Sequence, residues 1–139
     1  MDWDNKYATG VLIVDNDHKK LFELTNMLEE LSAAEQPQTH LIENQITRLL
    51  DYTVYHFERE KELMVKYGVV HLNQHVAEHA EFVDVAKEAC QNWMQNGEAA
   101  EIESLVKYLW NWLAEHIMGS DMELADALLL VDGINDTVA

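Results

Sequence analysis

Apolar residues recur every three or four positions along four long stretches of this chain, a spacing typical of one buried face of an α-helix. The predicted helices cover approximately residues 15–34, 39–66, 71–95 and 98–118. The connections between them are short, and short connections place consecutive helices side by side in opposite directions. The pattern therefore predicts an all-α fold, an up-down-up-down antiparallel four-helix bundle.

Residues that favour turns mark the ends of these helices. Pro37 separates the first two, and Gly68 and Gly97 follow the second and the third. Asp15 or Asn16 is the expected amino-terminal cap of the first helix, because a short polar side chain accepts hydrogen bonds from the free N–H groups of the first turn.

Shorter segments flank the predicted bundle. The first residues include aromatic and aliphatic side chains without helical spacing, which indicates an irregular arm packed on the bundle. Gly119 interrupts the pattern after the fourth helix, and Ser120 is expected to cap a short last helix. We expect one domain in four parts: the arm (1–14), the bundle (15–118), a loop with a terminal helix (119–131) and a polar tail (132–139).

Five histidines and two carboxylates stand on or beside the inward faces, where apolar residues are expected. They are His18, His56, Glu60, His75, His79, His116 and Asp121. A single inward histidine is usually a hydrogen-bonded core residue, but a buried polar group without a partner costs roughly 1–3 kcal/mol. A shared metal site would satisfy all seven together.

The connectivity brings these side chains to one end of the bundle. They stand near the start of the first and third helices and near the end of the second and fourth, which coincide in an up-down-up-down bundle. His116 and Asp121 are five residues apart, about 140° around a regular helix. A break at Gly119 is therefore expected to turn Asp121 back toward the site.

The ligand set is too large for one ion. Two six-coordinate irons offer about twelve positions. Five histidines, two bridging carboxylates and a bridging oxide or hydroxide would leave one position open. Leu113, Trp112 and Phe57 are the apolar side chains expected to wall this position, which suits a small neutral diatomic molecule.

With these residues the chain resembles a bacteriohemerythrin, a hemerythrin-like di-iron oxygen-binding domain, over about residues 1 to 125. The matching motifs are Asp15-Asn16-Asp17-His18-Lys19, His56-Phe57-x-x-Glu60, His75-x-x-x-His79, Trp112-Leu113-x-x-His116 and Asp121, with Trp3, Tyr7 and Gly10 in the arm. The resemblance implies reversible dioxygen binding at two irons bridged by oxide or hydroxide.

The resemblance also implies individual roles. One iron would be held by His75, His79 and His116, and the other, with the open position, by His18 and His56. Glu60 and Asp121 would bridge the two irons, and Leu113 would shield the oxygen pocket.

The chain departs from the family pattern at two places. Neither affects a ligand, but both bear on access to the pocket and on autoxidation. The chain has Val69-Val70 where the family usually has Tyr-Pro, and Lys61 where a second acid often follows the bridging glutamate. Of the two remaining histidines, His71 is expected at a solvated helix start, with a rim position or proton donor near the centre as the alternative. His40 has no assigned role.

Net charge and cysteine content limit the expected binding partners and the expected cellular compartment. The formal net charge of −17 opposes binding to nucleic acid and to anionic membranes. The single cysteine, Cys90, excludes an internal disulfide and fits a reducing compartment. The longest aliphatic run, residues 127–131, is too short to cross a bilayer, and no basic-then-apolar leader opens the sequence. We therefore expect a cytoplasmic protein.

Two enzyme classes compete with oxygen binding. The segment from His75 to His79 matches the H-x-x-E-H zinc-peptidase motif, with Glu78 as the base, but this interpretation leaves five other aligned residues unexplained. Ferritin-like oxidases use Glu-x-x-His pairs, and none of the five histidines has a glutamate three residues before it. The sequence favours a binding protein over an enzyme.

Within the binding class, storage, delivery or scavenging of oxygen competes with sensing. In the sensing alternative, the chain is the oxygen- or redox-sensing input domain of a signalling protein and reaches an output domain or partner through its carboxyl-terminal tail. Handling of nitric oxide or peroxide, and iron storage, also remain open.

Overall fold

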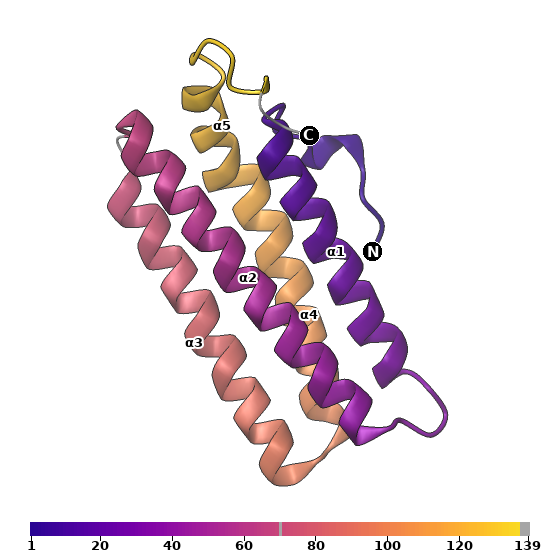
Figure 1. Ribbon diagram of the computed structural model, residues 1–139. Coiled ribbons are helices and arrows are strands. Elements are labelled where there is room, and N and C mark those ends of the chain that lie inside the picture. Colours follow the sequence, from indigo (N-terminus) through magenta and orange to yellow (C-terminus); the bar gives the residue numbers. More distant parts are fainter. Residues whose placement is uncertain (70, 137–139) are drawn as a thin grey trace.

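The computed structural model describes residues 1–69 and 71–136, and the regular elements there are all helices (Figure 1). Four long helices, α1 (Leu12–Ser32), α2 (Thr39–Tyr67), α3 (Leu72–Asn96) and α4 (Ala99–His116), are followed by a π-helical turn, η2 (Ile117–Asp121), and a short helix, α5 (Met122–Leu128). A single 3-10 turn, η1 (Asn5–Tyr7), lies in the arm.

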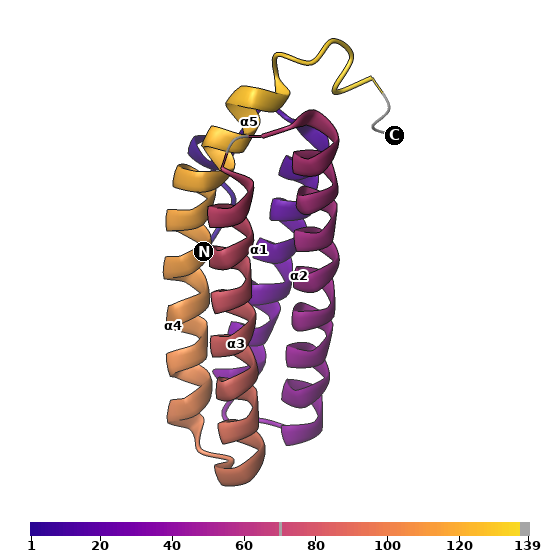
Figure 2. The same ribbon diagram turned by 90° about the vertical axis from the view of Figure 1, so that its left-hand side faces the viewer.

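The long helices form the expected antiparallel bundle. Each packs against two others, α1 against α2 and α4, and α3 against the same two. Figures 1 and 2 show that α1 begins, α2 ends, α3 begins and α4 ends at one end of the bundle, the end that also carries α5. The predicted up-down-up-down topology is therefore confirmed.

The predicted caps of α2 and α3 are also confirmed. Gly68 (φ 63°) and Gly97 (φ 62°) follow these helices in the left-handed conformation, which costs glycine little because it has no Cβ.

The predicted start of α1 is wrong. The helix begins at Leu12, so neither Asp15 nor Asn16 is its cap. Asp15 lies inside the first turn, where its buried carboxylate accepts hydrogen bonds from Thr9 N–H (2.8 Å), Thr9 Oγ1–H (2.7 Å) and Gly10 N–H (3.1 Å). The Asp15 carboxylate therefore accepts hydrogen bonds from the arm and not from the first turn of α1. The helix begins three residues before Asp15.

The arm packs on α1, as expected. Tyr7 is buried, and its ring and that of Trp3 lie 5.1 and 5.3 Å from the ring of Phe22. Aromatic pairs at these distances stabilise a packed arm.

The expected break at Gly119 is absent from the helix. The chain continues from α4 into α5 through the π-helical turn, in which Met122 N–H bonds the carbonyl of Ile117, five residues earlier. A π-turn contains one more residue than an α-turn, and this extra residue rotates Asp121 toward the side that His116 faces. The carboxylate is therefore turned inward by a widened helix and not by an interruption.

Ser120 does not cap α5, which also ends earlier than expected, at Leu128. The Ser120 hydroxyl donates instead to Glu78 Oε2 (2.6 Å). The residues after α5 form turns up to residue 136, the last that the structure describes.

The apolar core is divided by polar side chains. A large cluster fills most of the bundle, and a smaller one, which includes Val14, Met64 and Leu128, lies against α5. On α2, Glu60 stands between Phe57 of the large cluster and Met64 of the small one. None of the described helices is long and apolar enough to cross a membrane.

Candidate metal centre

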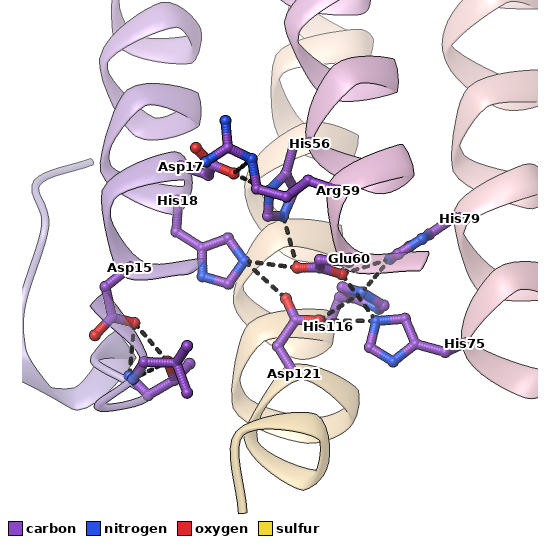
Figure 3. A network of polar contacts seen from close by, with 12 residues as sticks. Asp15, Asp17, His18, His56, Arg59, Glu60, His75, His79, His116 and Asp121 are labelled. Carbon is purple, nitrogen blue, oxygen red and sulfur yellow. Dashed lines mark hydrogen bonds and ion pairs between the residues drawn. The ribbon is translucent and has the colours of Figure 1, made fainter. Parts of the chain in front are cut away.

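All seven side chains singled out by the sequence converge at the end of the bundle, each between 0 and 6% exposed. Figure 3 shows them pointing toward one another from different helices. The five histidines come from the long helices, His18 from α1, His56 from α2, His75 and His79 from α3 and His116 from α4, while Glu60 comes from α2 and Asp121 from the π-turn.

Their ligand atoms form two groups that share both carboxylates. One group contains three histidines, His75, His79 and His116, with Glu60 and Asp121. The other contains His18 and His56 with the same two carboxylates. Within each group the nitrogen and oxygen atoms all lie within 4.8 Å of one another, close enough to surround one ion each.

Each shared carboxylate directs one oxygen to each group. Glu60 Oε1 lies 2.7 Å from His56 Nε2, and Oε2 lies 3.0 Å from His75 Nε2 and 3.1 Å from His79 Nε2. Asp121 Oδ2 lies 2.9 Å from His18 Nε2, and Oδ1 lies 2.9 Å from His75 Nε2. This is the arrangement of two carboxylates that can bridge a pair of ions.

The contacts of Asp121 fit metal ligands better than a hydrogen-bonded core. Both of its oxygens are buried, and neither makes a hydrogen bond of acceptable geometry within the described residues, although imidazole nitrogens lie 2.9–3.1 Å away. Neighbouring ligands of an octahedral ion with bonds of about 2.1 Å are about 3.0 Å apart. The Asp121 oxygens and the imidazole nitrogens are thus spaced as ligands around a common ion would be, and are not aligned for hydrogen bonds to one another.

Two further carboxylates lie behind the histidines. The Nδ1–H of His56 donates to Asp17 Oδ2 (3.0 Å), and the Nδ1–H of His116 donates to Glu78 Oε2 (2.9 Å). Such partners fix the orientation of a metal-binding imidazole and leave its Nε2 free for the metal. The ring of His18 is different, because its buried Nδ1 has no hydrogen-bond partner in the described part of the chain.

Sequence reasoning gave no role to Asp17 and considered Glu78 only as a peptidase base. A signal existed for Asp17, because it precedes Leu21 by four residues and Leu24 by seven and so falls on the apolar face of its helix. Glu78 carries no such signal. Its oxygen is engaged by His116 and Ser120, which argues against the free base that a zinc peptidase needs.

Ion pairing dominates the protonation of the metal-free site. Burial lowers the pKa of His56, but Glu60 and Asp17 raise it to about 10. Burial likewise lowers the pKa of His75, while its close contacts with the carboxylates of Asp121 and Glu60 raise it to about 9. Burial raises the pKa of the Glu60 carboxyl, yet the facing histidines, His56 first, hold it well below its usual value. Without metal, imidazolium–carboxylate pairs form around His56 and His75, whereas burial and the neighbouring histidines lower the pKa of His79.

Of the three apolar residues expected around the open position, Phe57 and Trp112 stack on histidines of the three-histidine group, although the open position is expected at the two-histidine iron. The ring of Phe57 stacks on His79 (centroids 3.8 Å apart, planes at 4°), and Trp112 stacks on His116 (4.2 Å, 15°). Phe57 and His79 also line a cavity of about 320 Å³ between α2 and α3. Leu113 is buried in the large core cluster.

The two other histidines lie outside the group. His71 is exposed immediately before α3, where its carbonyl accepts the N–H of His75 (3.0 Å), as expected for a solvated helix start. His40 is exposed near the start of α2, at the opposite end of that helix from Glu60.

The comparisons with known proteins agree with this geometry. The model of the hemerythrin HHE cation-binding domain matches residues 9–128. The chain is 33% identical to the bacteriohemerythrin of Pseudomonas paraeruginosa, covering 91% of this chain and 80% of that protein. It is 27% identical to the bacteriohemerythrin of Clostridium acetobutylicum, covering 89% and 98%, respectively.

A solved structure has the same fold. The crystal structure of a wild-type hemerythrin superimposes with a TM-score of 0.83 at 27% identity, covering 92% of this chain and 97% of that one. The match of the domain model to most of the chain identifies the family, and the fold and the buried histidine and carboxylate cluster agree with it. The chain belongs to the hemerythrin family, in the class of the HHE cation-binding domain.

Proposed function

We propose that this protein binds dioxygen reversibly at two irons bridged by oxide or hydroxide and held by the seven converging residues. The observation that carries the proposal is the pair of ligand groups sharing Glu60 and Asp121, with one oxygen of each carboxylate directed to each group. The related proteins named bacteriohemerythrin support the same function.

In this proposal each protein group has a distinct task. His75, His79 and His116 would hold one iron, and His18 and His56, with fewer protein ligands, would hold the iron at which dioxygen binds. Bound as a ferrous pair, the irons would supply electrons that dioxygen takes up and returns. Glu60 and Asp121 hold both ions at a fixed separation and balance their charge.

The apolar side chains select the ligand. Leu113 and Phe57 are buried in the large core cluster, and the rings of Phe57 and Trp112 cover the faces of His79 and His116. Burial in an apolar surrounding disfavours charged molecules, because an ion loses its hydration there. Apolar surroundings therefore favour a small neutral diatomic molecule over an ion.

Binding is favoured over enzymatic turnover by the engagement of the acids near the site. Asp17 accepts bonds from Tyr52 (2.9 Å) and His56 (3.0 Å), and Glu78 from His116 (2.9 Å) and Ser120 (2.6 Å). A carboxylate held in this way orients its partners and is poorly available as a general base. We keep the cytoplasm as the proposed compartment, on the basis of the single cysteine.

A second candidate function, sensing, is favoured by a contact between the two ends of the chain. The amide of Asn135 donates to the carbonyl of Gly10 (3.0 Å), and its oxygen accepts the N–H of Leu12 (2.9 Å). Leu12 begins the helix that carries His18. A shift of α1 on oxygenation would therefore reach the carboxyl-terminal segment and a signalling partner attached to it.

The deciding experiment is iron analysis on protein purified and reduced without air, followed by visible spectra before oxygen, with oxygen and after its removal. Two irons per chain and a charge-transfer band that appears and reverses are expected. One zinc without colour, or immediate irreversible oxidation, would contradict reversible oxygen binding. Hydrogen exchange of residues 129–136 with and without oxygen tests the sensor, which requires a change there.

A further inference from the structure

A buried carboxylate stands behind one histidine of the two-histidine group. The Nδ1–H of His56 donates to Asp17 Oδ2 (3.0 Å), while Nε2 of the same ring faces Glu60 Oε1 (2.7 Å). The imidazole thus lies between an outer carboxylate and the proposed iron position.

Asp17 is itself held in place. It is only 4% exposed, the Tyr52 hydroxyl donates to its Oδ1 (2.9 Å), and Nε of Arg59 lies 3.3 Å from its Oδ2. Figure 3 shows Asp17 next to both His56 and Arg59. Arg59 in turn packs over the ring of Tyr55, with its guanidinium 4.8 Å from the ring centre. Two hydrogen bonds and an ion pair therefore fix the position of the carboxylate, and the three partners share its negative charge.

The other histidine of this group lacks such a partner. Nδ1 of His18 is buried and makes no hydrogen bond within residues 1–69 and 71–136. An outer carboxylate therefore acts on this group through His56. Because an anionic acceptor on Nδ1–H makes the imidazole a stronger electron donor at Nε2, its presence favours ferric over ferrous iron.

We propose that Asp17 is a positioning residue that fixes the ring of His56 and sets the reduction potential of the two-histidine iron. Tyr52 opposes Asp17 in this network, because its hydroxyl withdraws negative charge from the carboxylate that His56 uses. The inference rests on the proposed function for its iron, but the hydrogen-bonded network is independent of oxygen binding.

The test uses Asp17→Asn, Tyr52→Phe and a control, Asp51→Asn. Asp51 is exposed on α2 and lines a groove together with Tyr52, so its replacement removes one negative charge without touching the network. Two quantities are measured on the full chain, Co²⁺ affinity by competition with a chelator and the midpoint potential of the iron-loaded protein.

Asp17→Asn and Tyr52→Phe are expected to shift the midpoint potential in opposite directions. Asp17→Asn weakens Co²⁺ binding roughly 10- to 100-fold, as loss of an outer partner typically does. It raises the midpoint potential, and a tenfold change in the preference for ferric iron corresponds to about 59 mV for one electron. Tyr52→Phe lowers the potential, because Asp17 then offers more charge to His56. Asp51→Asn changes neither quantity.

Opposite shifts are not produced by a general loosening of the fold, which would move both variants in the same direction. Shifts of equal sign, or potentials equal to that of the wild type, would overturn the proposal. If Asp17→Asn does not fold, Tyr52→Phe, which leaves the carboxylate in place, decides alone by the sign of its shift. Failure of the proposed function is recognised separately, because the wild type then binds no oxygen while the Co²⁺ affinities still report on the network.

Discussion

The Nε2 atoms of His79 and His116 lie 3.0 Å apart on neighbouring helices. The lone pairs of two neutral imidazoles repel at this distance, so the pair needs either a shared proton or an ion bound to both. Four histidine Nε2 atoms also lie 2.7–3.4 Å from the oxygens of Glu60, where protons or bound ions are needed between nitrogen and oxygen. The metal is therefore expected to contribute to folding as well as to function.

Glu60→Gln should weaken both metal positions, whereas His79→Ala should weaken mainly the three-histidine position. Glu60 faces both groups and His79 only one. Loss of one partner from a buried charged pair also costs about 3–5 kcal/mol of stability. Iron per chain and thermal unfolding with and without metal measure both effects. Full iron loading in both variants would contradict the ligand assignment.

Leu113→Ala should retain both irons and oxidise faster in the ferrous state, because the side chain proposed to shield the pocket is truncated. The cavity is expected to cost roughly 2–5 kcal/mol of stability. Stopped-flow oxidation in air-saturated buffer gives the rate.

Leu105→Ala is the matched control for this change. Leu105 is buried to the same extent on the same helix, about two turns farther from His116, so it should lose similar stability without faster oxidation. Equal oxidation rates in the two variants would show that Leu113 has no shielding role.

Metal should stabilise the protein more at pH 9 than at pH 6. His56 and His75, with pKa values raised to about 10 and 9, give stability to the metal-free fold that is fully present below 6.5 and lost as the pH rises through these values. The depressed pKa of Glu60 gives stability above about 4.5 that is lost on acidification.

His56 and His75 must each lose a proton to bind metal, so metal affinity rises with pH. The stability of the metal-free fold falls over the same pH range. Thermal unfolding with and without Co²⁺ between pH 6 and 9 checks this. A gain in Tm that is constant or falls with pH would contradict it.

Asp15→Asn should detach the arm without removing metal. The carboxylate accepts three hydrogen bonds from Thr9 and Gly10, and a bond to a charged acceptor contributes about 1.5–3 kcal/mol. Faster proteolysis of the first ten residues, at unchanged iron content, is the expected result. Asp2→Asn, at an exposed position of the same arm, serves as the control.

Much of the site could be predicted because histidine at a core position interrupts an otherwise apolar pattern. His56, Glu60, His75 and His79 stand at helical spacing among apolar residues, and the alternating direction of the helices brings them to one end. These features depend on local periodicity and chain length, which the sequence contains in full. The helix ends at Gly68 and Gly97 were predictable for the same reason, because left-handed backbone favours glycine.

The tertiary structure decided the features that depend on hydrogen bonds between distant segments. Asp15 accepts hydrogen bonds from the arm, and α1 begins earlier than predicted. Asp121 reaches the site through a π-helical turn, which the sequence pattern did not predict. The outer partners join residues far apart in sequence, Asp17 with His56 and Glu78 with His116. By itself the sequence determined which side chains meet at the end of the bundle. Only the packed structure decided which oxygen faces which nitrogen, because hydrogen-bond geometry depends on the final distances and angles between helices.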